Sequence, residues 1–133
     1  ADISLAIATD SGLIAPILRK ADTKSPQEIA TEVKDLAERA QIGKLERDEI
    51  VGGTFSVSNL GSYGISQFKA IINPPQGAIL AIGVGAEKII SMDKKPVVAN
   101  MMSVSLSCDH RIIDGAVGAE FLKILKDKIE NPK

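Results

Sequence analysis

The chain has 133 residues, of which 44% are hydrophobic and 25% are charged, and its formal net charge is −1. These values are typical of one folded domain, and the near-neutral charge excludes an electrostatic surface for nucleic acid or for an anionic membrane. One cysteine cannot form an internal disulfide, one tyrosine and three phenylalanines are too few for base-stacking platforms, and no apolar run of about 18 residues exists to span a membrane.

The beginning of the chain has the pattern of two neighbouring strands. Apolar residues alternate from Ile3 to Thr9, which predicts a strand, and Asp10-Ser11-Gly12 predicts a tight turn into a returning strand, Leu13 to Leu18. Pro16 lies inside the second strand and favours a sheet edge or a bulge, because proline cannot donate to a ladder. Ala1 is not a methionine and the alternation starts at once, so we expect a piece of a longer polypeptide that begins inside a folded domain.

A long helix is predicted next. Ser25 has the side chain of an N-cap, Pro26 suits the first helical position, and Glu28 completes a capping box. Gly43 marks the end of this helix. The charged segment from Lys44 to Ile50 predicts a loop or a short turn. One apolar stripe along the helix consists of Ile29, Val33, Leu36, Ala37 and Ala40.

A third strand is predicted from Gly52 to Asn59, where the period of two resumes. Phe55 and Val57 share one face of this strand. Ser56 and Ser58 share the other face, which we expect to be exposed because it is polar.

The middle of the chain contains a proline-rich segment and a buried strand. Leu60 to Asn73 gives no clear prediction, whereas Asn73 to Gln76 predicts a rigid extended element because its two prolines fix the backbone. Ala78 to Val84 is a continuous apolar run, typical of a strand buried on both faces. Gly83-Val84-Gly85 lacks the third glycine of a dinucleotide loop, since Lys88 stands in its place, but close approach of a ligand to this backbone stays open.

The end of the chain predicts a hairpin and a second long helix. Lys88 to Met92 and Pro96 to Cys108 flank a turn at Asp93-Lys94-Lys95. The helix is predicted from Gly115 to Glu130 and stops before Pro132. With no internal repeat, the elements add up to an α/β fold with a mixed sheet and two long helices.

The stretch before the last helix holds the only histidine and the only cysteine of the chain. Val104 to Cys108 alternates as a half-buried strand, and the helical period starts after Asp114-Gly115. His110 therefore lies where a strand has ended and a helix is about to begin, and it is flanked by Asp109 and Arg111. Side chains at such a boundary rest on a rigid scaffold and can point into a cleft.

An imidazole in this place suits general-base catalysis. With an ordinary pKa of about 6.5, an imidazole is largely neutral at pH 7 and can accept a proton. Taking that proton from a thiol of ordinary pKa about 8.5 is uphill by about 2.7 kcal/mol, which is a small part of an acyl-transfer barrier. A thiol is therefore the substrate that His110 would activate most easily.

Neighbouring residues leave other chemistry open. Cys108 and His110 share a strand face and could form a nucleophile pair, although Cys108 falls on the apolar side, where cysteine packs as a small apolar residue. Asp109 and Asp114 could pair or bind a metal, but a single histidine with no further acidic cluster is a weak metal signal. Asp114 is also placed to cap the last helix or to hold the geometry around His110 and Arg111, and both roles can hold together.

Four blocks of the sequence resemble one family. Asp109 to Gly115 is similar to the DHRxxDG signature of the dihydrolipoamide acyltransferases, which are the core subunits of 2-oxo acid dehydrogenase complexes. Three further blocks match this family in its order, namely Asp10 to Pro16, Gly52 to Gly61 and Ile71 to Gln76. The last of them, together with Ser107-Cys108 before the signature, looks most like the acetyl-transferring, pyruvate-type members.

The resemblance implies a chloramphenicol-acetyltransferase-like α/β fold, a mixed sheet packed with helices, of which residues 1–133 form the carboxyl-terminal part of a single acyltransferase catalytic domain, incomplete at the N-terminus. It implies homotrimers with active sites between subunits, so that Ser58 faces His110 of a neighbouring chain. His110 would take the proton from the thiol, Ser58 would donate to the oxyanion, and Asp114 would support the histidine. The positions expected to border coenzyme A are Ser58, Asn59, Gly83 and Gly85.

The resemblance also implies substrates and partners. An acetyl group would move between dihydrolipoamide and coenzyme A without a metal, and the lipoyl group would be carried on a domain that this chain lacks, since no Asp-Lys-Ala lipoylation site occurs. The trimers would assemble into a larger core that meets lipoyl domains, the decarboxylase and dihydrolipoamide dehydrogenase, with no nucleic acid and no membrane. The expected compartment is the bacterial cytoplasm, with the mitochondrial matrix as the alternative.

Three alternatives stay open. A branched-chain acyl or succinyl transferase of the same family would differ in its pocket side chains. A non-catalytic structural or docking subunit of the complex core would share the fold, but such relatives lack the signature histidine that is present here as His110. A thioesterase with Cys108 as nucleophile predicts inactivation when that thiol is alkylated.

Overall fold

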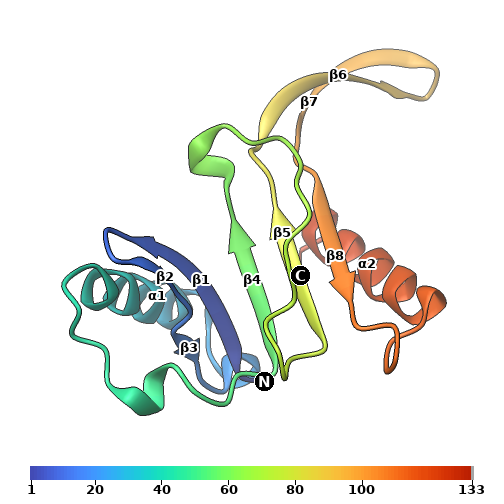
Figure 1. Ribbon diagram of the computed structural model, residues 1–133. Coiled ribbons are helices and arrows are strands. Elements are labelled where there is room, and N and C mark those ends of the chain that lie inside the picture. The colour runs from blue at the N-terminus through green and yellow to red at the C-terminus, as the bar shows by residue number, and fades with distance from the viewer. Residues whose placement is uncertain (133) are drawn as a thin grey trace.

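A six-stranded mixed sheet forms the framework of the chain, as Figure 1 shows for the computed structural model, which describes residues 1–132. The strands are β1 (Ile3–Thr9), β2 (Gly12–Ile14), β3 (Ile17–Leu18), β4 (Phe55–Asn59), β5 (Ala78–Ile82), β6 (Ala86–Met92), β7 (Lys95–Met101) and β8 (Val104–Cys108). The helices are α1 (Pro26–Gln41) and α2 (Gly115–Glu130), with short 3-10 turns η1 (Ala21–Thr23), η2 (Arg47–Glu49) and η3 (Gly61–Tyr63).

The sheet has the order β2-β1-β4-β5-β8, and β3 pairs with β1. β4 is parallel to both β1 and β5, whereas β8 is antiparallel to β5. β6 and β7 form a separate two-stranded sheet that extends away from the main sheet at the top of Figure 1. The prediction of an α/β fold with a mixed sheet and two long helices is confirmed.

Of the two positions predicted for Pro16, a sheet edge or a bulge, the edge is confirmed, and the register with β1 is the same on both sides of the proline. The returning strand is divided into β2 and β3, and both pair antiparallel with β1. Pro16 itself offers only its carbonyl oxygen, which accepts a hydrogen bond from the Leu5 backbone N–H at 2.8 Å. Because proline has no N–H, it cannot donate to the ladder, and an edge position leaves no partner strand without a donor.

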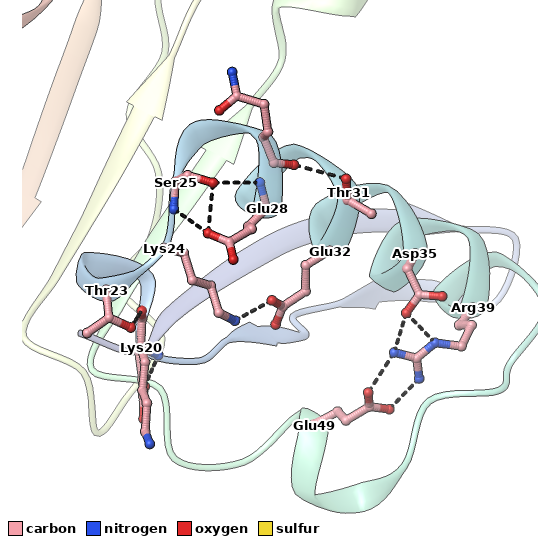
Figure 2. A network of polar contacts seen from close by, with 12 residues as sticks. Lys20, Thr23, Lys24, Ser25, Glu28, Thr31, Glu32, Asp35, Arg39 and Glu49 are labelled. Atoms are coloured by element: carbon pink, nitrogen blue, oxygen red, sulfur yellow. Dashed lines mark hydrogen bonds and ion pairs between the residues drawn. The ribbon is translucent and has the colours of Figure 1, made fainter.

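Helix α1 begins with the predicted capping box, which is drawn in Figure 2. The Ser25 hydroxyl accepts a hydrogen bond from the Glu28 backbone N–H at 3.3 Å, and the Glu28 carboxylate accepts one from the Ser25 backbone N–H at 2.7 Å. The hydrogen bond from the Ser25 backbone N–H, and next the one from the Ser25 hydroxyl, hold the pKa of the Glu28 carboxyl below its usual value. The helix buries Leu36 and Ala40 from the predicted apolar stripe and packs against β1 and β3.

The two faces of the main sheet differ in character. On one face the register aligns Leu5, Val57, Leu80 and Leu106 across four strands. Helix α2 covers this face, since the ring of its Phe121 lies 5.7 Å from that of Phe55 on β4. The opposite face carries Ile79 and otherwise mainly small and polar side chains. The segment between η3 and β5 covers it, and there the Ser107 hydroxyl donates to the Ala70 carbonyl oxygen at 2.7 Å.

The expected exposure of Ser56 is wrong. Ser56 is 3% exposed, because Gln76 covers it and accepts a hydrogen bond from its hydroxyl. Its neighbour Ser58, on the same face, is half-buried. A polar strand face can be buried when the chain supplies a polar partner for it, and Gln76 is that partner here.

The segment from Asn73 to Gln76 also differs from its prediction. It is a turn rather than an extended element, closed by a hydrogen bond of 3.0 Å from the Gln76 backbone N–H to the Asn73 carbonyl oxygen. The peptide bond between Pro74 and Pro75 is cis. Proline fixes one torsion of the backbone, so it is compatible with turns as well as with extended chain. The buried strand that follows, β5, is confirmed.

The apolar run from Pro96 to Cys108 is two strands instead of one. β7 pairs with β6 in the projecting hairpin, and β8 pairs with β5 in the main sheet. The chain passes from one sheet to the other at Met102 and Ser103, where the Ser103 carbonyl oxygen accepts from the Gly83 backbone N–H at 2.9 Å. Both strands have the same period of two, so the pattern does not reveal the change of sheet.

Within residues 1–132, no helix has the length and apolar character to cross a membrane.

Candidate active site

The histidine lies in a tight loop between β8 and α2. The backbone of Asp109 ties this loop down, because its N–H donates to the Gly77 carbonyl oxygen at 2.7 Å and its carbonyl oxygen accepts from the N–H groups of Ile112 and Ile113 at 3.1 and 3.0 Å. His110, held between these anchors, is exposed. A fixed backbone beneath an accessible imidazole is the arrangement that the sequence predicted for this boundary.

Asp109 rather than Asp114 fixes Arg111. The Arg111 guanidinium donates to the Asp109 carboxylate from Nε at 2.9 Å and from Nη2 at 2.6 Å, and its backbone N–H donates at 3.0 Å. The hydrogen bonds from the Arg111 side chain, and next those from its backbone, lower the pKa of Asp109 from 3.8 to about 2. Sequence reasoning considered Asp109 only for a carboxylate pair or a metal and missed this role.

Asp114 caps α2, which confirms one of its two expected roles. Its Oδ1 accepts a hydrogen bond of 2.9 Å from the Val117 backbone N–H, so one orphan donor of the first turn is satisfied. The loop that carries His110 therefore has its start fixed by Asp109 and its end fixed by Asp114. Whether Asp114 also supports the imidazole stays a prediction.

A groove of about 390 Å³ opens beside the imidazole. It is lined by Leu106, Cys108, His110, Ile113, Asp114, Gly115, Gly118, Ala119 and Leu122. Cys108 is half-buried, and its sulfur would lie 3.4 Å from a Cβ atom built at Gly118, so it packs against the helix backbone. This packing is that of a small apolar residue, although Cys108 and His110 do share the groove.

Ser58 lies at the other end of the sheet from His110. Its register partners are Ala81 on β5 and, through that strand, Ser105 at the beginning of β8. From Ser105 to Cys108 the strand rises by about 10 Å, and β4 is about 10 Å from β8 across the sheet. His110 comes two residues further on, so Ser58 and His110 of one chain do not meet.

The other predicted positions cluster around Ser58. The Asn59 side chain closes its own turn by accepting from the Gly61 backbone N–H at 2.8 Å. Gly83 is buried because the backbone at Ser66 crosses directly over it and would collide with a Cβ atom. Gly85 is exposed. The close approach foreseen at Gly83 is thus made by the chain itself, and contact of these positions with coenzyme A stays a prediction.

Among residues 1–132, no group of three or more histidine, cysteine, aspartate or glutamate side chains is arranged to hold a metal ion. The polar groups beside the groove are the His110 imidazole and the capped first turn of α2. An exposed imidazole in such a place suits proton transfer.

The sheet, the loop and the signature around His110 define a class of acyltransferase. Residues 1–133 match the family model described as 2-oxoacid dehydrogenases acyltransferase (catalytic domain), and the chain belongs to this family. Relatives include the dihydrolipoyllysine-residue acetyltransferase components of pyruvate dehydrogenase complexes from Dictyostelium discoideum (mitochondrial), 53% identical over 98% of this chain, and from Rhizobium meliloti, 48% identical over 99%. The chain spans only 21% and 30% of the length of these two proteins.

Solved structures agree with the fold. The dihydrolipoamide acetyltransferase of Azotobacter vinelandii superposes with a TM-score of 0.95 at 37% identity, over 98% of this chain and 54% of that chain. A structure of the cubic core of the pyruvate dehydrogenase multienzyme complex gives the same values. The Azotobacter study addressed the catalytic roles of a serine, a histidine four residues before an asparagine, and that asparagine. The serine there precedes the histidine by 52 positions.

Proposed function

We propose that this chain is the carboxyl-terminal part of an acyltransferase catalytic domain that transfers an acetyl group between dihydrolipoamide and coenzyme A. The observation that carries the proposal is a spacing. Ser58, His110 and Asp114 are separated by the same 52 and four positions as the three residues studied in the Azotobacter acetyltransferase. Asp114 stands where that enzyme has an asparagine, and either side chain can accept the capping hydrogen bond.

His110 would act as the general base. Its exposed imidazole can reach a thiol in solution or in the neighbouring groove, and its backbone is held by the Asp109 loop. Transfer of the thiol proton to the imidazole leaves a sulfur nucleophile that attacks the thioester carbonyl carbon. When the tetrahedral intermediate collapses, the imidazolium returns the proton to the departing thiolate, so the imidazole is neutral again at the end of the reaction.

Ser58 would stabilise the tetrahedral oxyanion by donating a hydrogen bond from its hydroxyl. A single donor of this kind contributes about 2.7–4 kcal/mol to lowering such a barrier. Because Ser58 and His110 lie at opposite ends of one sheet, the hydroxyl and the imidazole must come from two chains. This separation supports a site shared between neighbouring chains, and we propose homotrimers with one such site at each contact between neighbours.

The projecting hairpin also supports an assembly. Ile89 and Val98 face each other across β6 and β7, and they are 75% and 63% exposed. An isolated two-stranded sheet is marginally stable in water, so this apolar pair favours coverage by another copy of the chain. We propose that such trimers build a larger core, as in the cubic core of the solved relative, and work with lipoyl domains, the decarboxylase and dihydrolipoamide dehydrogenase.

Complementation between two inactive variants tests both the residues and the shared site. In the full-length protein, His110→Ala should nearly abolish thiol-dependent acetyl transfer, and Ser58→Ala should lower kcat by about 10²–10³-fold. If each site takes its serine and its histidine from neighbouring chains, co-expression of the two variants in equal amounts restores one site in each mixed trimer, which is about a quarter of all sites. Normal turnover by His110→Ala would refute the base, and failure of the mixture to recover would refute the shared site.

The acyl group is tested separately. We propose acetyl because the relatives described above are acetyltransferase components of pyruvate dehydrogenase complexes. Comparison of acetyl, isobutyryl and succinyl donors with the full-length protein should give the highest kcat/KM for acetyl. Preference for isobutyryl or succinyl would assign a branched-chain or succinyl transferase, and no turnover with any donor would favour a docking subunit.

Two remaining proposals concern the thiol and the compartment. Because Cys108 lines the groove beside His110, the test removes its thiol without adding bulk: Cys108→Ala should leave transfer intact, whereas full loss would favour a thioesterase with Cys108 as nucleophile. Relatives occur in mitochondria, as in Dictyostelium discoideum, and in bacteria, as in Rhizobium meliloti. We propose the bacterial cytoplasm, with the mitochondrial matrix as the alternative.

A further inference from the structure

A buried polar cluster lies beneath the main sheet and outside the groove beside His110. Ser4 on β1, Ser56 on β4 and Gln76 before β5 are 2%, 3% and 8% exposed. The Gln76 amide Nε2 donates to the Ser4 hydroxyl at 2.8 Å, and its Oε1 accepts from the Ser56 hydroxyl. Gly53 makes room for the cluster, because a Cβ atom there would collide with the Ser4 hydroxyl. The amide is therefore used at both ends and held in one orientation.

Stability alone does not require this cluster. Apolar side chains of the same shape fill such a position about as well, because a buried hydrogen bond largely replaces bonds to water. What polar partners add is direction, since the amide must stand at a set distance and angle from two strands. Gln76 thus fixes the point at which the Asn73–Gln76 turn enters β5.

That point is also the floor of the loop that carries the histidine. Gly77 follows Gln76 directly, and its carbonyl oxygen accepts the 2.7 Å hydrogen bond from the Asp109 backbone N–H. A Cβ atom at Gly77 would lie 2.6 Å from Cδ1 of Ile112, so the same glycine backbone contacts the far side of the loop. Residues on both sides of His110 therefore rest on Gly77.

We propose that Gln76 is a positioning residue for His110, acting through Gly77 and Asp109, and that the two buried serines are its anchors in β1 and β4. The inference rests on the proposed role of His110. A shift of about 1 Å in a catalytic group can cost about 100-fold in rate. A loop floor that moves by a fraction of this distance would therefore lower turnover while leaving the groove beside His110 nearly unchanged.

The test replaces the cluster by apolar side chains in the full-length protein. The variant carrying Ser4→Ala, Ser56→Ala and Gln76→Met removes every hydrogen bond of the cluster and leaves no unpaired partner. We expect it to assemble and melt near the wild type, with kcat lower by about tenfold or more and KM for coenzyme A within about twofold. Wild-type kcat in this variant would overturn the inference.

A second variant separates positioning from stability. Gln76→Glu, protonated because it is buried, keeps one donor and one acceptor in the cluster. It should melt at a lower temperature than the triple variant but retain more of the wild-type kcat. Under a purely structural role, the variant with the lower melting temperature would also have the lower kcat. If kcat simply follows melting temperature in both variants, the inference is wrong.

Two controls complete the test. Glu49→Gln, far from the histidine loop, should lower melting temperature without changing kcat. His110→Ala reports on the base itself. If His110→Ala remains active, the proposed function fails; if it is inactive while the triple variant turns over normally, only the positioning role fails.

Discussion

Two arginine–carboxylate pairs in this chain have similar geometry but differ in what they hold together. Arg39 on α1 donates from both Nη atoms to the two carboxylate oxygens of Glu49 on η2, at 2.6 Å each, and from Nε to Asp35 at 2.8 Å, as Figure 2 shows. Arg111 makes a similar fork with Asp109, which lies two residues earlier in the same loop. One pair joins two separate elements, and the other shapes a single turn.

Exposure separates the pairs as clearly as sequence distance does. The Arg39 side chain is 29% exposed and the Arg111 side chain 87%, so water and salt screen the second pair more strongly. A partly sheltered link between α1 and η2 should contribute to the free energy of unfolding. A screened link inside one turn should contribute little to it and should act instead on the placement of His110.

The largest effect is expected from Asp109→Asn. The amide keeps one acceptor oxygen but loses the charge and the fork to Arg111, so the loop around His110 loosens. We expect kcat for acetyl transfer by the full-length protein to fall by about 10- to 100-fold, with little change in melting temperature. Steady-state kinetics and calorimetry on the same preparation measure both, and a large loss of melting temperature with normal kcat would reverse the assignment of the two pairs.

Glu49→Gln should have the opposite profile. It breaks the fork from Arg39, and we expect a melting temperature lower by about 3 °C with kcat unchanged. Glu38→Gln is the matched control on the same helix, since Glu38 lies 3.9 Å from Lys34 in an exposed pair. The control should melt within about 1 °C of the wild type, and an equal loss in both variants would mean that the Arg39 fork adds nothing.

The smallest effect is the pH dependence of the Arg39–Glu49 pair. Hydrogen bonds from Arg39, and next from the Glu46 backbone, lower the pKa of Glu49 from 4.5 to about 2. A lowered carboxyl pKa stabilises the fold at pH values above the unfolded pKa, and this contribution is lost as the pH falls from 4.5 towards 2. The difference in melting temperature between wild type and Glu49→Gln should therefore be full at pH 7, smaller at pH 4 and nearly absent at pH 2. A constant difference would exclude linkage to this carboxyl.

The sequence predicted elements whose signals are local. The capping box of Ser25 and Glu28, the cap of α2 by Asp114 and the apolar run of β5 each depend on residues within one or two turns of chain. His110 was placed at the correct boundary for the same reason, since the change from a period of two to a helical period is visible in the residues around it.

Features that depend on distant partners were missed. Ser56 is buried because Gln76, 20 residues later, covers it, and the break between β7 and β8 exists because each strand pairs with a different neighbour. No local period carries this information. The proposed contact of Ser58 with His110 needs a second copy of the chain, so even one complete subunit does not contain it.

The position of Ser58 and His110 at opposite ends of one sheet has a genetic consequence. On the shared-site proposal, each copy lends its hydroxyl to one neighbour and its imidazole to the other. A copy defective in both groups would silence two of the three sites in its ring, so a small fraction of faulty chains would remove about twice that fraction of the sites, and equal amounts of faulty and healthy chains would leave about a quarter of them. Such an allele would behave as dominant over a healthy one.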